Sequence, residues 1–214
     1  MLPLVVGPFL FIPAGTLGWP MGWAVLLIYV TGTLALSLTA ATLDPGLAEE
    51  RFKSGEGAKK WDWLLTAVAN FLLIAVMLPV CGFDYSLLWS HGLPALLPGL
   101  GLMVFVLGYV IIIWSMRVNP FFSAVVRIQE DRGHVVAATG PYRFVRHPGY
   151  LAMILQFLAI PLALGSLYAY IPAALAAGVY IARTALEDKT LKNELTGYQA
   201  YAERVRFRLF PKVW

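Results

Sequence analysis

The 214-residue sequence is poor in charge and has a single cysteine. Charged residues make up 13% of the chain, against the roughly 25% typical of soluble domains. The lone Cys81 excludes an intrachain disulfide and a metal centre built from several cysteines. No glycine-rich turn follows a strand-like run, which argues against a soluble dinucleotide-binding fold. Because 59% of the residues are hydrophobic and form long runs, we predict a polytopic membrane protein.

The basic residues lie in three segments, 44–60, 117–146 and 183–212. Paired apolar runs separate these segments, and the turns that connect each pair carry no Lys or Arg. The positive-inside rule therefore places all three segments on the cytoplasmic face. Since the cations are explained by topology, no nucleic-acid partner is expected. We predict an integral membrane protein whose long loop at 117–147 and C-terminus are cytoplasmic.

The apolar runs predict an all-α fold, a polytopic membrane helical bundle of about five to six spans. The first run, 2–17, contains three prolines, so it is a short or kinked span or an interfacial segment. An outer turn is expected at 82–94. The glycines around Gly101 lie inside an apolar run, which favours helix packing over a nucleotide loop.

Two regions follow from this pattern. Residues 1–116 form N-terminal membrane spans, and residues 117–214 form a catalytic region. The second region comprises a cytoplasmic cofactor-binding loop, a helical hairpin and a C-terminal amphipathic helix, interrupted around Gly197. We expect this tail to return over the loop as a lid.

The stretch GPYRFVRHPGY, residues 140–150, sets Arg146 and His147 directly before an apolar run. Arg183 and Glu187 lie four residues apart at the end of the last span, hence on one helix face. In a small bundle these helix ends must lie close together. An aromatic cavity with both charge signs suits a ligand that carries an amine, a carboxylate and a cationic centre, such as S-adenosylmethionine. Alternatively, the basic residues are ordinary interfacial cations, and Arg183 simply pairs with Glu187.

This stretch, the hairpin after it, the sequence RTALED and a tail ending in RLFP resemble the isoprenylcysteine carboxyl methyltransferase family. The family belongs to a clan of integral-membrane methyltransferases that includes phospholipid N-methyltransferases. The resemblance covers residues 119–211. It implies S-adenosylmethionine as the cofactor and no metal. The cofactor contacts that it implies are His134, Val135, Val136, Ala137, Tyr142, His147, Pro148, Gly149, Tyr150 and Glu187. It also implies that Arg183 is catalytic and orients a substrate carboxylate. Asp188 stands where the family usually has a second glutamate.

The implied function is methyl transfer to a lipophilic acceptor, with carboxyl O-methylation of an isoprenylcysteine-like substrate as the leading interpretation. One alternative is phospholipid or amine N-methylation, in which His147 or Glu187 would accept a proton. Another is an NADPH-dependent membrane reductase, because membrane sterol reductases have a stretch similar to residues 146–150. The expected partners are membrane lipids and a lipophilic or lipid-linked acceptor. The sequence leaves the acceptor and the oligomeric state open.

Overall fold

The computed structural model describes residues 2–43, 57, 59–90 and 93–214, and no strand occurs in these ranges. The helices, in chain order, are α1 (Leu2–Ala14), α2 (Pro20–Leu43), α4 (Lys60–Phe71), the π-helix η1 (Leu72–Met77), α5 (Leu78–Leu87), α6 (Leu96–Val118), η2 (Glu130–Arg132), η3 (Gly140–Arg143), α7 (Pro148–Leu164), α8 (Tyr170–Glu194) and α9 (Tyr198–Arg204). The predicted all-α fold is confirmed. Most of the first basic segment, 44–60, lies outside the described residues.

Three helices are long and apolar enough to cross a membrane: α2, the continuous rod formed by α4, η1 and α5, and α6. The apolar α7 has 17 residues, about 26 Å at 1.5 Å per residue. α1 has 13 residues and contains Pro8 and Pro13, in line with the expected short or kinked segment. α8 begins apolar and becomes charged from Arg183 onward. The polytopic bundle is confirmed, whereas the total of five to six spans stays a prediction that depends on α1, α7 and α8.

The rod continues past the point where the sequence predicted a turn. The outer turn was expected from Gly82, but α5 ends at Leu87, and Leu88 caps it with φ 54°. Gly82 serves helix packing, because a Cβ there would lie 2.6 Å from the carbonyl oxygen of Leu10 in α1. The expected start of the turn was therefore wrong. The glycine permits a close backbone contact and does not end the helix.

α7 occupies the middle of the bundle and packs against both α6 and α8. A Cβ at Gly101 of α6 would lie 2.3 Å from the backbone nitrogen of Ala163, and one at Gly108 would lie 2.4 Å from Gln156. The helix-packing role predicted for the glycines around Gly101 is confirmed. This close approach fixes α7 along its length, so the start of α7 is held firmly relative to α6.

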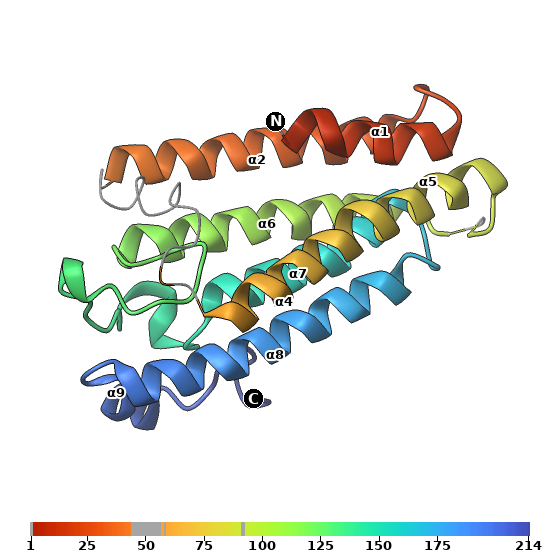
Figure 1. Ribbon diagram of the computed structural model, residues 1–214. Coiled ribbons are helices and arrows are strands. Elements are labelled where there is room, and N and C mark those ends of the chain that lie inside the picture. Colours follow the sequence, from red (N-terminus) through yellow and green to blue (C-terminus); the bar gives the residue numbers. More distant parts are fainter. Residues whose placement is uncertain (1, 44–56, 58, 91–92) are drawn as a thin grey trace.

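The loop between α6 and α7, the first turn of α4 and α9 all lie at the same end of the bundle, on the left in Figure 1. α8 ends at Glu194, and Gly197 adopts φ 84° before α9, so the predicted interruption is found. α9 is amphipathic, burying Tyr198 and Tyr201. The tail then returns to the loop, where the Arg146 backbone N–H donates to the Phe207 carbonyl over 2.9 Å.

We expect Gly101→Ala to destabilise the protein by about 1–3 kcal/mol, because the added methyl group overpacks the contact between α6 and α7. Gly99→Ala is the matched control, since a Cβ at Gly99, on the same helix, meets nothing within 4 Å. Thermal unfolding of the detergent-solubilised variants measures both effects. Equal unfolding temperatures for the two variants would contradict the packing role of Gly101.

Candidate active site

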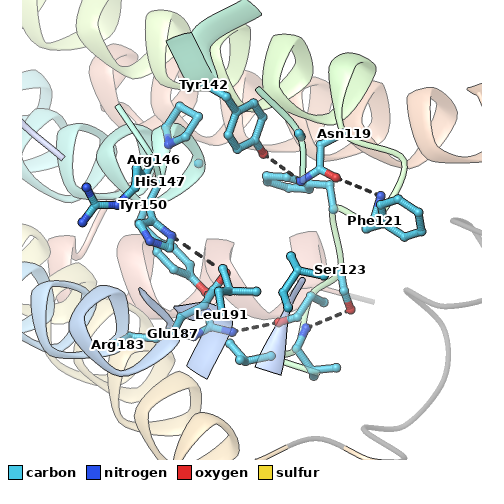
Figure 2. A pocket seen from close by; sticks show the side chains of 18 of the residues that line it. Asn119, Phe121, Ser123, Tyr142, Arg146, His147, Tyr150, Arg183, Glu187 and Leu191 are labelled. Atoms are coloured by element: carbon cyan, nitrogen blue, oxygen red, sulfur yellow. Dashed lines mark hydrogen bonds and ion pairs between the residues drawn. The ribbon is translucent and has the colours of Figure 1, made fainter. Parts of the chain in front are cut away.

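A cavity of about 280 Å³ lies at the end of the bundle where the loop and the tail meet. All eleven residues proposed from the sequence line it: His134, Val135, Val136, Ala137, Tyr142, His147, Pro148, Gly149, Tyr150, Arg183 and Glu187. Figure 2 shows Tyr142 and Asn119 on one side of the cavity, with Arg183 and Glu187 on the opposite side. The fold therefore brings the whole predicted set together, although α8 contributes its two members from a distant part of the chain.

Among the described residues, Glu187 is the acidic residue that lines the cavity, and its side chain is 21% exposed. The Tyr150 hydroxyl donates a hydrogen bond to its Oε2 atom. His147 Nδ1 lies 3.8 Å from its Oε1 atom, and the imidazole stacks on the Tyr150 ring with centroids 5.9 Å apart. Pro148 begins α7, where its missing N–H costs no helical hydrogen bond, and this start positions His147 and Tyr150. The result is a carboxylate held among aromatic rings.

His134 forms part of the loop wall of the cavity. Its ring stacks on Phe121 with centroids 4.5 Å apart, and its Nδ1 atom accepts a hydrogen bond of 3.3 Å from the Gln129 backbone N–H. Accepting at Nδ1 requires the neutral tautomer that carries its proton on Nε2. Burial, together with the positive charges of Arg132 and Arg127, lowers the pKa of His134 to about 4. His134 therefore stays neutral at physiological pH.

Tyr142 is held from two sides. The Asn119 side chain donates to its hydroxyl oxygen over 3.1 Å, and the Tyr201 hydroxyl donates to its carbonyl over 2.7 Å. Burial raises the pKa of the Tyr142 phenol, so it stays protonated. Gly140, which opens η3, adopts φ 55° and packs so closely on Trp114 and Val118 that a Cβ would meet them at about 3 Å. This glycine lets the turn lie against α6.

Asp188 connects the loop, α8 and the tail without lining the cavity itself. It is 1% exposed and accepts from Arg146 Nε over 2.7 Å, from Arg208 Nε over 2.9 Å and from the Tyr198 hydroxyl over 3.1 Å. Burial alone would raise the pKa of Asp188, but hydrogen bonds from His147, Arg146 and Arg208 hold it well below the usual range. Asp188 therefore remains a carboxylate that anchors cations from two segments.

Arg183 lines the cavity but makes no ion pair with Glu187 among the described residues. Its Nε atom donates to Asp62 Oδ1 over 2.5 Å, and its Nη2 atom donates to the Ala124 carbonyl over 3.0 Å. The guanidinium carbon also lies 5.0 Å from the centre of the Tyr150 ring. The alternative pairing considered from the sequence is thus absent from the described part of the chain, and Arg183 is bound to protein groups on two sides.

Sequence reasoning missed several residues of the site. Asp62 lies on α4 and does not line the cavity, but it binds Arg183, which does. The lining includes Leu36, Thr66 and Ile112 from the region first regarded as membrane spans only. Asp62 did carry a signal, because an ionisable residue at the start of an apolar run is costly and often functional. The aromatic contributions of Phe121 and Tyr198 carried none, since aromatic residues are common throughout the chain.

Comparison with protein families matches residues 97–196 to the phospholipid methyltransferase family. The match supports a membrane methyltransferase that acts on lipids. This family belongs to the same clan as the isoprenylcysteine carboxyl methyltransferases, so the resemblance predicted from the sequence is confirmed. The matched residues run from the first turn of α6 to just beyond α8 and include all eleven residues proposed for the site. A comparison with curated proteins found no significant match.

The low pKa of His134 predicts a pH effect on stability. The pKa is about 4 in the folded chain and about 6.5 when unfolded, so the unfolded chain binds more protons between these values. Stability should therefore fall as the pH is lowered from about 6.5 to about 4, and less steeply in His134→Gln. Thermal unfolding across this range provides the measurement. Identical slopes for parent and variant would show that His134 is not buried in its neutral form.

Proposed function

We propose that this protein is an S-adenosylmethionine-dependent methyltransferase of the membrane, and that its acceptor is the amine of a lipid. The observation that carries the proposal is the convergence of the eleven predicted residues on one cavity, within a region that matches phospholipid methyltransferases. The cavity lies at the end of apolar helices, where a lipid headgroup meets the aqueous phase. Its volume, about 280 Å³, is near the lower end of the range for small-molecule pockets.

The donors and acceptors of the cavity fit this cofactor. Glu187 offers a carboxylate to its amino group, and the neutral His134 stacked on Phe121 offers an aromatic edge to the adenine. The rings of Tyr150 and His147 lie beside Glu187 and suit a sulfonium cation. A Cβ at Gly149 would lie 2.8 Å from the ring of Phe122, so only glycine keeps the loop against the start of α7. When bound, the cofactor would supply an electrophilic methyl group.

The charge balance favours an amine acceptor over a carboxylate. Three arginines line the cavity, and each has an aspartate partner: Arg127 with Asp131 at 3.0 Å, Arg146 with Asp188 at 2.7 Å and Arg183 with Asp62 at 2.5 Å. Glu187 is then the lining charge without a full cationic partner in the described residues. With the lining arginines bound by aspartates, Glu187 is the lining charge best placed to attract a cationic group. This shifts the proposal from carboxyl methylation, which relied on Arg183, to N-methylation.

An ammonium group must lose a proton before its nitrogen can attack. In this proposal His147 accepts that proton. Its Nδ1 atom lies 3.8 Å from Glu187 and its Nε2 atom lies 3.5 Å from Asp188, so two carboxylates stabilise the imidazolium that forms. The hydroxyl of Tyr198, 3.2 Å from Nε2, fixes the ring orientation. The remaining residues act by alignment and exclusion of water, which can supply roughly 7–11 kcal/mol of the barrier.

The acyl chains of the acceptor would lie on the membrane side of the cavity. Leu36 of α2, Ile112 of α6 and Met153 of α7 line it there, and all three are apolar side chains from helices of the bundle. We infer that the lipid enters sideways from the bilayer, while the cofactor enters from the cytoplasm, where the positive-inside rule orients the loop and tail.

Calorimetry on the detergent-purified protein should detect S-adenosylmethionine binding, and Glu187→Gln should weaken it by about tenfold or more through loss of a charge-assisted hydrogen bond. His147→Ala should weaken it less but abolish transfer to an amine. Glu203→Gln, an exposed change on α9, is the control and should bind like the parent. Binding of NADPH instead of S-adenosylmethionine would overturn the proposal in favour of the reductase.

Transfer of a labelled methyl group identifies the acceptor. The purified protein is supplied in parallel with vesicles that contain phosphatidylethanolamine and with a farnesylated cysteine that has a free carboxylate. We expect label in the aminolipid, with at least roughly tenfold lower incorporation into the carboxylate, because one unit charge within about 12 Å, at an effective dielectric near 20, changes binding by about this factor or more. Greater incorporation into the farnesylated cysteine would favour carboxyl methylation and return Arg183 to its predicted role.

A further inference from the structure

Asp62 is a fully buried carboxylate on α4, 0% exposed, and it lies outside the region that matches the methyltransferase family. Its Oδ2 atom accepts a hydrogen bond of 2.8 Å from the Val126 backbone N–H. Its Oδ1 atom accepts the 2.5 Å bond from Arg183 Nε. Arg183 is 3% exposed, so both charges of the pair are removed from water.

A buried ion pair of this kind does not need to be present for stability. Moving two charges out of water costs several kcal/mol per ion, and apolar replacements are often as stable. Next to a cavity that suits a charged ligand, the pair therefore calls for a functional explanation. Asp62 and Arg183 are 121 residues apart, so their contact also joins the N-terminal part of the chain to α8.

The pair holds the cofactor-binding loop at two adjacent points. Asp62 binds the backbone N–H of Val126, and Arg183 binds the carbonyl of Ala124. Val126 in turn accepts from the Lys59 backbone N–H over 3.3 Å, just before α4 begins. Ala124 and Val126 both line the cavity. The wall formed by this part of the loop is thus positioned by α4 as well as by α8.

The pair also sets the charge that faces the ligand. The Arg183 guanidinium lies over Tyr150, whose hydroxyl donates to Glu187. Without Asp62, the positive charge of Arg183 would act directly on the Glu187 end of the cavity. Asp62, bound to the Nε atom of Arg183, largely neutralises that positive charge.

We propose that Asp62 is a positioning and charge-setting residue of the methyltransferase site, which holds the loop at Val126 and neutralises Arg183 so that the cavity favours a cationic ligand. This inference rests on the proposed function. It assigns a role in the site to α4, which sequence reasoning had treated only as a membrane span.

The test compares S-adenosylmethionine, whose sulfur is cationic, with S-adenosylhomocysteine, whose sulfur is neutral. Calorimetry gives the dissociation constant of each ligand for the parent, Asp62→Asn, Arg183→Gln, the double variant and the exposed control Glu203→Gln. The affinity ratio is the affinity for S-adenosylmethionine divided by that for S-adenosylhomocysteine. It isolates the electrostatic effect, because a purely structural defect weakens the binding of both ligands together. One unit charge at about 12 Å and an effective dielectric near 20 changes an interaction by about tenfold.

Asp62→Asn keeps an oxygen for the Val126 N–H but removes the negative charge. Binding of the cationic S-adenosylmethionine should therefore weaken relative to S-adenosylhomocysteine, and the affinity ratio should fall by about tenfold. Arg183→Gln should raise the ratio, and the double variant should return it close to the parent value. Should Asp62→Asn fail to fold because Arg183 is left unpaired, Arg183→Gln and the double variant still test the proposal, because the ratio should rise in Arg183→Gln and return to the parent value in the double variant.

Ratios that stay at the parent value in both Arg183→Gln and Asp62→Asn, or equal losses for the two ligands, would overturn the charge-setting role. That result differs from failure of the proposed function itself, in which the parent binds neither ligand and the inference falls with it. A shift in the Glu203→Gln control equal to that of Asp62→Asn would also overturn the proposal, because any lost negative charge would then suffice.

Discussion

The arrangement of the site depends on burying ionised side chains at the end of a membrane bundle without leaving any of them uncompensated. Asp188 is the centre of this arrangement, since it binds cations from the loop and from the tail while lying on α8. A buried carboxylate with several charge-assisted hydrogen bonds holds its partners in one geometry. If Asp188 were lost, Arg146 and Arg208 would repel each other in a poorly hydrated space, and the tail would lose its attachment to the loop.

Close helix packing gives this polar end a rigid base. Gly101 and Gly108 allow α6 to contact α7 at distances that no other residue permits, and Gly82 does the same for α5 against α1. In a bilayer, van der Waals packing of small residues is a main source of helix association. The first residues of α7, which include His147 and Tyr150 at the cavity, therefore start from a fixed position. The cavity is therefore bounded by closely packed helices and by a hydrogen-bonded loop at the end of the bundle.

The cavity is lined by arginines that are paired with aspartates and by one carboxylate, Glu187, that has no arginine or lysine partner among the described residues. Each lining arginine is held by an aspartate, while Glu187 is held by a phenol and lies near an imidazole. In the proposed function these groups bind the sulfonium of the cofactor and the ammonium of the acceptor, and they need little rearrangement because their dipoles are oriented before the ligand arrives. The aromatic walls formed by Phe121, His134 and Tyr150 add surfaces on which planar or cationic groups rest.

The sequence by itself determined the helical membrane class and all eleven predicted residues of the cavity lining, because apolar runs and the 140–150 motif are local features of the chain. Only the tertiary structure decided the partners of these residues. Arg183 faces Glu187 by helical spacing, yet it binds Asp62, 121 positions earlier, because α4 packs beside α8 and supplies a closer, fully buried carboxylate. The local sequence likewise predicts a turn at Gly82, but this residue is helical and packs closely against α1. Local patterns define helices and motifs, whereas the pairing of buried charges depends on which distant helices come into contact.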